Sequence, residues 1–339
     1  MKNCLLIPIL FVYGFSNAQF KDIYPIGDQI NIGYKSSMVP DKENILFEAN
    51  PIVRLPIYNN IKTKLESENP RASKGSTLYL NFNPTIRMYN DNSKPIKTPS
   101  YKISLGFQNI IRLDPTNKIK YHFLSYGIES GHYSNGQSKC IFGKNIDDGS
   151  EDCNNSYLSI TNDSKLTDLI NRESGNFSTN FSEVAINYRI VDLADDYKPK
   201  QGISFLLKYN RFHNNLLWLI SDLGGYTQED IKIYGRNRYN LGFTYMRRLS
   251  EEAFIKEKIN VNHWTIGANY ELIDRPHKSV NQSRFELSAT AYFENNLGIF
   301  INGIFGHDNY NYRFVDSGSQ FFIGLTYDIF PPVEMIHRQ

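Results

Sequence analysis

Strict alternation of apolar and polar residues dominates the chain. Over residues 284–294 the odd positions are Phe, Leu, Ala, Ala and Phe, while the even positions are Arg, Glu, Ser, Thr, Tyr and Glu. A period of two is typical of a β-strand with one apolar and one polar face. The same alternation, sometimes noisier, predicts about twelve strands of roughly ten residues, near residues 28–37, 47–57, 78–88, 101–107, 122–134, 178–190, 203–212, 239–245, 264–272, 285–293, 298–308 and 321–329.

Two all-β architectures fit this pattern. A soluble sandwich would use short strands and bury the apolar faces, whereas an outer-membrane barrel turns the apolar faces to lipid and the polar faces to its lumen. A signal peptide at the N-terminus, the 23 Tyr and 22 Phe residues, and a final strand that ends in Phe330 favour the barrel. We therefore predict an all-β fold, a twelve-stranded antiparallel transmembrane β-barrel.

The N-terminal sequence indicates export. Lys2, an apolar stretch over residues 5–15 and small residues before Gln19 are typical of a secretory signal peptide. Residues 1–18 are then expected to be removed, and residues 19–339 to form a single barrel domain. The mature chain would keep Cys140 and Cys153, which in an exported protein suggest one disulfide, with two free thiols as the alternative.

Composition excludes several other classes of protein. The 37 Lys and Arg residues nearly balance the 35 Asp and Glu residues, so no basic surplus exists for nucleic-acid binding. Beyond the N-terminus no apolar run approaches the roughly 20 residues that a membrane-spanning helix requires. The longest irregular stretch, about residues 137–176, is rich in Asn, Asp, Ser and Gly. It predicts an extracellular loop, because the periplasmic turns of such barrels are short.

The candidate chemistry lies where a strand opens onto that loop. His132 and Ser134 are two residues apart and share a face, and the parity of the strand places this face on the lipid side. A histidine can remove a serine proton near neutral pH, and a third residue should orient the imidazole. On the next strand Asn180 has the same outward parity, whereas Glu183 has lumen parity. Parity therefore selects Asn180, and a polar cluster at the barrel rim without catalysis is the alternative.

The segment His132-Tyr133-Ser134-Asn135-Gly136, with Asn180 on the next strand, resembles the motif of the bacterial outer-membrane phospholipases A, His-x-Ser-Asn-Gly followed by Asn. The resemblance covers essentially the whole mature chain. It implies a calcium-dependent phospholipase A1/A2 of the outer membrane that hydrolyses acyl esters of glycerophospholipids. It also implies that Ser134 is the nucleophile, that His132 is general base and acid, and that Asn180 accepts the other imidazole N–H.

The same resemblance implies an oxyanion hole and a metal site. The Gly136 N–H would help to hold the oxyanion, together with a Ca²⁺ that polarises the ester carbonyl. The Ca²⁺ ligands would be the Gln137 carbonyl, Asn176, and Ser93 from a second subunit, so the active form would be a reversible homodimer. This chain departs from the family in its longer segment between Gly136 and Asn180, and in Asn176, which stands where the family has a serine.

Two other functions fit part of the pattern. A lipid A deacylase also has a His-x-Ser motif on the outer face of a barrel, but with a Glu as the orienting residue. A non-catalytic porin or transport barrel needs an open lumen. Pairing of the inward charges across the lumen would plug it, and so discriminates against a porin. The charges concerned are Arg87, Glu271, Arg284 and Glu286.

Overall fold

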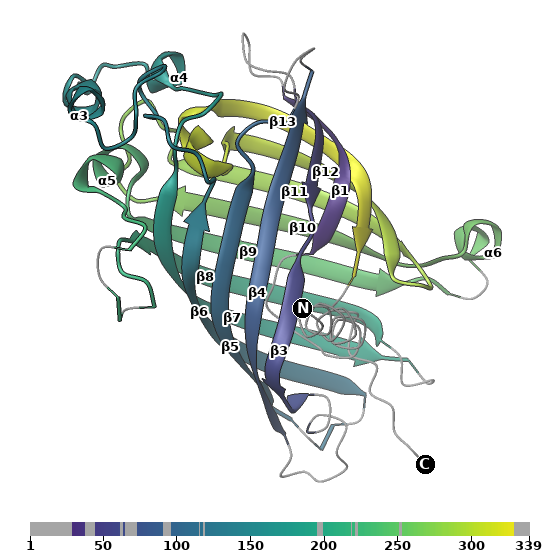
Figure 1. The fold of residues 1–339 in the computed structure, drawn as a ribbon. Coiled ribbons are helices and arrows are strands. Elements are labelled where there is room, and N and C mark those ends of the chain that lie inside the picture. Colours follow the sequence, from purple (N-terminus) through teal and green to yellow (C-terminus); the bar gives the residue numbers. More distant parts are fainter. Residues whose placement is uncertain are drawn as a thin grey trace, which may run out of the picture.

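Thirteen antiparallel strands form one sheet in the part of the chain that the computed structural model describes (Figure 1). This part comprises residues 29–37, 45–61, 64, 73–90, 96–114, 116–117, 119–194, 199–217, 219–220, 223–250 and 253–328. The expected signal peptide, Ser93 and Phe330 lie outside these residues. The strands are β1 (Ile30–Ser37), β2 (Ile45–Asn50), β3 (Val53–Asn59), β4 (Lys74–Tyr89), β5 (Ser100–Arg112), β6 (Lys120–Ser134), β7 (Ser178–Leu193), β8 (Pro199–His213), β9 (Asn237–Arg248), β10 (Val261–Ile273), β11 (Ser283–Phe293), β12 (Leu297–His307) and β13 (Ser317–Tyr327).

The sheet closes on itself as a twelve-stranded barrel. β1 pairs with β13, from Ile30 opposite Tyr327 onward, so the first and last strands meet. β2 and β3 both pair with β4, one with its second half and the other with its first half. They therefore act as one barrel strand that is interrupted at Pro51 and Ile52. The predicted twelve-stranded antiparallel barrel is confirmed, with this interruption as the one feature that the alternation did not predict.

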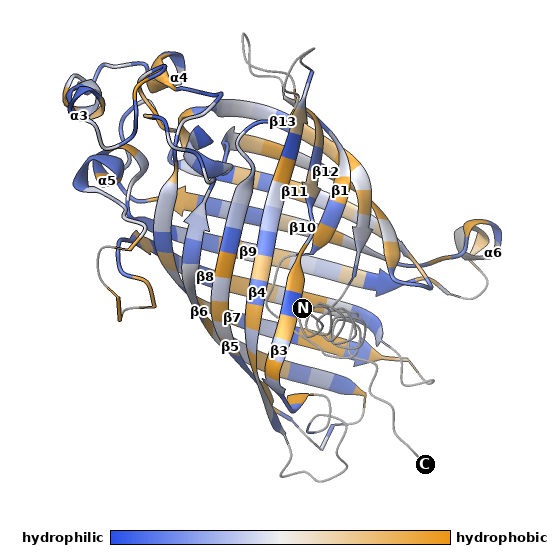
Figure 2. Ribbon diagram, in the orientation of Figure 1, coloured by the Kyte–Doolittle hydropathy of each residue, from blue (hydrophilic) through white to orange (hydrophobic). Residues whose placement is uncertain are grey.

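The two faces of the barrel differ as the alternation requires. Along the strands in Figure 2, apolar and hydrophilic residues follow one another. Outward side chains such as Ile186, Phe205 and Leu241 are 45–57% exposed, while the lumen is lined mainly by polar and charged residues. Closure pairs the strand backbones, and an apolar outer face suits hydrocarbon, so the barrel has the two properties that a membrane-spanning β-structure needs.

The helices lie in the connections between strands, and they are α3 (Glu151–Leu158), α4 (Leu166–Leu169), α5 (Gln228–Tyr234), α6 (Phe254–Ile259) and the 3₁₀ helix η1 (Asn311–Val315). Among the described residues, no helix has both the length and the apolar character to cross a membrane. In Figure 1, α3, α4 and α5 gather at one end of the barrel, and α6 lies at the other. The long connection between β6 and β7 belongs to the former end, which we call the loop end.

One large apolar cluster fills the lumen at the loop end. Inward aromatic side chains of β6, β7 and β8 pack against Tyr234 of α5 and Phe314 of η1. Phe212, for example, meets Phe314 with ring centroids 6.4 Å apart, and Tyr133 meets Phe177 at 5.0 Å. Below the cluster the lumen keeps a mainly polar cavity of about 460 Å³ and one of mixed lining of about 350 Å³. The loops therefore rest on a packed platform rather than over an empty mouth.

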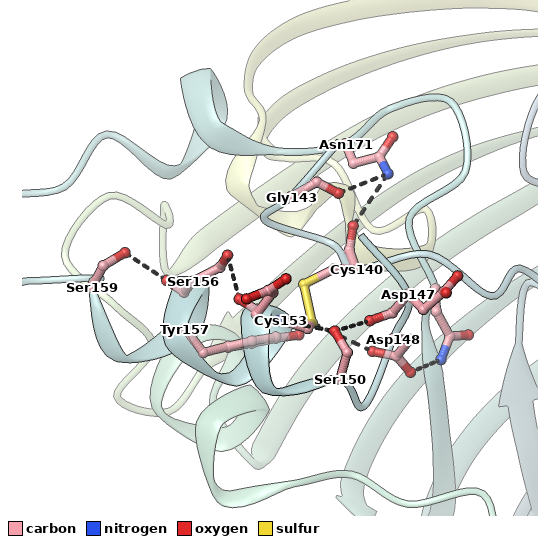
Figure 3. The surroundings of a disulfide bond; sticks show 12 residues. Cys140, Gly143, Asp147, Asp148, Ser150, Cys153, Ser156, Tyr157, Ser159 and Asn171 are labelled. Carbon is pink, nitrogen blue, oxygen red and sulfur yellow. Dashed lines mark hydrogen bonds between the residues drawn. A yellow bond between two sulfur atoms is a disulfide. The ribbon is translucent and has the colours of Figure 1, made fainter. Parts of the chain in front are cut away.

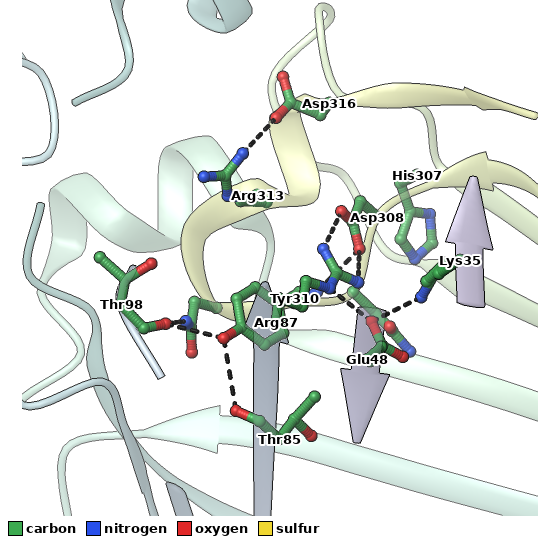
Figure 4. A network of polar contacts seen from close by, with 12 residues as sticks. Lys35, Glu48, Thr85, Arg87, Thr98, His307, Asp308, Tyr310, Arg313 and Asp316 are labelled. Atoms are coloured by element: carbon green, nitrogen blue, oxygen red, sulfur yellow. Dashed lines mark hydrogen bonds and ion pairs between the residues drawn. The ribbon is translucent and has the colours of Figure 1, made fainter. Parts of the chain in front are cut away.

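Charged side chains in the lumen are paired, and the largest network is centred on Arg87 (Figure 4). The Arg87 guanidinium donates two hydrogen bonds to the Asp308 carboxylate, at 2.5 and 2.8 Å. It also donates to Glu48 at 2.5 Å, and Lys35 donates to the same carboxylate at 2.8 Å. Arg87 is only 1% exposed and stacks 4.0 Å above the Tyr310 ring. Because Asp308 follows β12 and Arg87 lies on β4, the network ties distant strands together across the lumen.

The other inward charges that the sequence singled out are paired as well. Arg284 donates to Glu286 at 2.5 Å, and Glu271 contacts His307 at 2.9 Å. Each of the four inward charges that the sequence singled out therefore has a partner in the lumen. Arg284 and Glu286 lie on the same strand, and Glu271 and His307 lie on the two strands beside it, so these two pairs follow the barrel wall and do not cross the lumen.

Replacing Arg87 by Met is expected to destabilise the barrel by about 3–5 kcal/mol, because Asp308 stays buried without its cation and Glu48 keeps only Lys35. Burial alone would raise the pKa of Asp308, but the Arg87 charge and hydrogen bonds outweigh burial and hold that pKa well below its usual range. The carboxyl of an unfolded chain titrates near about 3.9. The stabilisation by Asp308 is therefore complete above that pH and is lost as the pH falls through the folded-state pKa. Urea unfolding in detergent micelles should show the full difference between wild type and variant at pH 7, and a smaller one below about pH 4.

Arg275→Met is a matched control. Arg275 pairs with Asp274 at 3.3 Å, but its side chain is 88% exposed. Such a surface pair contributes little to stability. Similar losses in the two variants would contradict the assignment of a structural role to the lumen network.

Candidate active site

The strand register places the three candidate catalytic residues on one patch of the outer face. β6 and β7 pair without interruption from Lys120 opposite Asp192 to Ser134 opposite Ser178. In this register His132 lies directly opposite Asn180. Ile128 lies four residues before His132 and therefore has the same parity. Its side chain is 45% exposed, which shows that this face points outward. The patch lies at the last residue pairs between β6 and β7, next to the loop end of the barrel.

A hydrogen bond joins the predicted base to its predicted orienting residue. His132 Nδ1 and Asn180 Oδ1 are 2.9 Å apart. Glu183 points the other way, into the lumen, where its carboxylate is 3.2 Å from Lys208 Nζ and 3.3 Å from Asn210 Nδ2. The geometry therefore gives Asn180, and not Glu183, the position beside the imidazole.

Ser134 is half-buried beside His132 on the same face. No hydrogen bond between their side chains is present in the described part of the chain. Residues i and i+2 of a strand lie roughly 7 Å apart at Cα, which is within reach of a serine and an imidazole that turn toward each other. Catalytic hydrogen bonds are often long without substrate and tighten when it binds.

Gly136 has the conformation expected of an oxyanion-hole residue. Its φ is +66°, a left-handed conformation that glycine adopts without strain, and a Cβ there would meet nothing within 4 Å. Among the described residues no acceptor takes its N–H. Gly136 is exposed, so this N–H is open to an incoming carbonyl oxygen.

The long connection after Gly136 is a folded element that a disulfide holds together (Figure 3). Cys140 and Cys153 are bonded, and Cys153 lies on α3, whose first turn is capped by the Ser150 side chain. The connection docks on its neighbours at the loop end: Tyr157 donates to Asp230 at 3.1 Å. Burial raises the pKa of Asp230 in this contact. The insertion is therefore part of the platform beside the site.

Two of the three expected calcium ligands, Gln137 and Asn176, are on backbone segments that pair with each other beyond the ends of β6 and β7. The backbones on either side of the connection stay paired beyond the strands, since Asn135 N–H donates to Phe177 and Asn176 N–H donates to Lys139. Gln137 and Asn176 thus lie on facing segments. The third expected ligand, Ser93, is outside the described residues.

Asp148 is a carboxylate at this place that the sequence reasoning missed. Asn176 Nδ2 is 2.7 Å from Asp148 Oδ2. Carboxylate, amide and backbone carbonyl oxygens are the donors that Ca²⁺ prefers, so the residues fit such an ion in kind. In the described part of the chain, no three His, Cys, Asp or Glu side chains cluster at a metal-binding distance. These residues therefore allow a site made of oxygen ligands, to which backbone carbonyls and a further segment of chain would have to contribute.

A second outward Ser–His contact lies nearby, which the sequence reasoning also missed. His213 Nε2 is 2.6 Å from Ser182 Oγ. The Asn215 N–H donates to His213 Nδ1, so a neutral His213 carries its proton on Nε2 and donates it to the serine. Ser130 Oγ lies 3.4 Å from Ser182 Oγ and donates a hydrogen bond to the Phe181 carbonyl. A histidine that donates to a serine cannot deprotonate it, so this group is structural.

Sequence comparisons assign no family to the chain. No protein-family model matches it, and no curated protein matches it in sequence. The resemblance to the outer-membrane phospholipases A therefore has no support from these comparisons beyond the motif residues themselves.

Solved outer-membrane barrels resemble the chain in fold. The outer-membrane phospholipase A from Escherichia coli is 11% identical, with a TM-score of 0.48, over 90% of this chain and 94% of that one. A calcium-bound dimer of the Salmonella typhi enzyme is 12% identical, with a TM-score of 0.48, over 89% and 92%. An outer-membrane channel from Pseudomonas putida F1 is also 12% identical, with a TM-score of 0.35, over 90% and 97%. At these identities the likenesses concern the path of the backbone alone and assign no activity to this chain.

The disulfide is expected to stabilise the insertion locally. In protein purified without reductant, alkylation should label neither Cys140 nor Cys153. Replacing both by Ser should lower the stability of the closed loop by about 3 kcal/mol on the chain-entropy model. Limited proteolysis should then cut within residues 141–152 faster, while the barrel keeps its heat-modifiable migration on gels. Two free thiols in unreduced protein would rule this prediction out.

Proposed function

We propose that this protein is a phospholipase A1/A2 of the bacterial outer membrane, with a Ser134–His132–Asn180 triad on the outer face of the barrel. The observation that carries the proposal is the hydrogen bond between His132 Nδ1 and Asn180 Oδ1, beside a serine of the same outward parity. Polar side chains facing lipid are costly unless they have a function. A serine beside a histidine that an asparagine orients is a specific reason for polar side chains on that face.

The chemistry follows from the positions of the protons. The imidazole of His132 takes the Ser134 hydroxyl proton on Nε2, while its Nδ1–H stays bonded to Asn180. Ser134 Oγ then attacks the ester carbonyl carbon, and the Gly136 N–H receives the oxyanion that forms. His132 returns the proton to the glycerol oxygen that leaves with the lysophospholipid. Water, deprotonated by the same imidazole, then frees the acyl group from Ser134.

The surroundings favour a lipid as the substrate. The site faces outward above a surface of exposed apolar side chains, including Ile103, Ile128 and Val184 at 45–55% exposure. Acyl chains that lie along this surface would bring the ester of a glycerophospholipid to the rim where Ser134 lies. An ester-hydrolysing site that opened into the lumen would not meet a membrane lipid.

Neither alternative function fits the geometry as well. A lipid A deacylase of this type needs a Glu beside the histidine, and Glu183 is engaged in the lumen with Lys208. A porin needs an open passage, and here the ion pairs around Arg87 and the apolar cluster at the loop end occupy it.

Calcium and a second subunit belong to the proposal. Gln137, Asn176 and Asp148 would provide oxygen ligands at the rim, and Ser93 of a second copy would provide another. When bound there, Ca²⁺ would polarise the ester carbonyl and stabilise negative charge on its oxygen. One rim segment offers few of the ligands that this ion needs, which is a reason for activity to depend on a homodimer.

Ser134→Ala and His132→Ala are each expected to lower phospholipase activity on the order of a thousandfold or more, because the nucleophile or its base is lost. Asn180→Ala should lower it less, since the base remains and only its orientation is lost. The assay is release of fatty acid from phospholipid in mixed micelles by detergent-folded protein with Ca²⁺. Ser138→Ala is the matched control, because Ser138 is an exposed serine close to the motif. Full activity of folded Ser134→Ala would refute the proposed function.

Asp148→Asn is expected to raise the Ca²⁺ concentration for half-maximal activity by about tenfold, because one charged oxygen donor becomes neutral. Asp163→Asn is the control, since it removes the same charge from an exposed site in the same insertion. Activity that a chelator leaves unchanged would contradict the calcium part of the proposal and leave the triad standing.

A further inference from the structure

The connection that follows β8 lies directly on the His132–Asn180 pair. Asn180 has outward parity, yet it is completely buried. Its Nδ2 donates to the Leu223 carbonyl at 2.5 Å, although Leu223 is 43 residues away in the sequence. The next residue, Gly224, faces the imidazole of His132. A short backbone segment, Leu223–Gly224, therefore covers the pair from the outside.

The Leu223 carbonyl decides which way the Asn180 amide points. A carbonyl oxygen only accepts hydrogen bonds, so the NH₂ end of the amide must face Leu223. Oδ1 is then the end that faces His132 Nδ1, at 2.9 Å. Oδ1 also only accepts, so Nδ1 must carry the imidazole proton. The neutral ring thus keeps Nε2 unprotonated, which is the form that can take a proton from Ser134.

Gly224 is the residue that allows this approach. Its φ is +73°, a backbone conformation in which residues other than glycine are strained. A Cβ at this position would overlap His132 Cε1 and would lie 2.9 Å from Nδ1. The adjacent Gly225 is different, since a Cβ there would meet only Asn214, at 3.8 Å. The close contact is therefore specific to one of two neighbouring glycines.

We propose that Leu223–Gly224 is a positioning element of the active site, which fixes the Asn180 amide and through it the proton position on His132. This inference rests on the proposed function, since it concerns the same triad. Without the Leu223 carbonyl, nothing on this segment would stop the Asn180 amide from turning by 180° and offering NH₂ to Nδ1. The ring would then hold its proton on Nε2 and could not act as a base toward Ser134.

The test is a double-mutant cycle between Gly224→Ala and Asn180→Asp, with Gly225→Ala as the control. A carboxylate has two accepting oxygens, so an Asp at position 180 offers an acceptor to His132 Nδ1 in either orientation, and it no longer donates to the Leu223 carbonyl, which leaves no hydrogen bond there for Gly224→Ala to break. We expect Gly224→Ala to lower kcat on the order of a hundredfold in the Asn180 protein, with KM nearly unchanged. In the Asn180→Asp background the same substitution should change kcat by less than about threefold. Gly225→Ala should leave kcat within about twofold of wild type.

Each outcome separates this inference from the proposed function. Heat-modifiable migration and the Cys140–Cys153 disulfide report that each variant is folded. An equal loss of kcat in both backgrounds would show a merely structural role and would overturn the inference, as would full activity of Gly224→Ala. Either result is compatible with an inactive Ser134→Ala, so the triad would stand. Activity in Ser134→Ala would instead remove the proposed function and this inference together.

Discussion

The requirement that every strand backbone be paired within the sheet governs the whole molecule. Pairing β13 with β1 and β2 with β4 completes the ring of strands, and it fixes which side chains face outward and which face the lumen. A polar residue on the outer face must then find its partners locally. Ser130, Asn180 and Ser182 do so through neighbouring side chains and backbone carbonyls. Ser134, beside these three residues, makes no side-chain hydrogen bond within the described part of the chain.

The barrel separates two kinds of electrostatics. In the lumen, buried charges are matched by opposite charges, as in the Arg87 network, and these contacts join strands that are far apart in sequence. At the outer site the groups are neutral amide, imidazole and hydroxyl, and their order depends on the direction of hydrogen bonds. A neutral asparagine is suited to a surface next to hydrocarbon, where an uncompensated carboxylate would be costly. An amide, unlike a carboxylate, must also be held with its oxygen, and not its nitrogen, toward the imidazole.

The period of two in the sequence predicted the strands and was enough to prefer Asn180 over Glu183, because parity along a strand is a local property. The choice of a barrel over a sandwich needed the export signal, the aromatic content and the final strand in addition. The break at Pro51 and Ile52 was not predictable in this way, since β2 and β3 are defined by their pairing with β4. Asp148 and Gly224 were missed for the same reason. Both lie on loops that fold back onto parts of the chain many residues away, and neither has a local pattern that marks it.

The uninterrupted pairing of β6 with β7 has a consequence for how such a chain can change. From Lys120 to Ser134, fifteen successive pairs hold His132 opposite Asn180. The paired strands therefore set the register, and the register does not depend on the length of the connection between β6 and β7. Chain could be added or removed there without moving the two side chains relative to each other. The disulfide-bonded connection occupies this position, which is a natural graft point for a foreign surface-displayed segment.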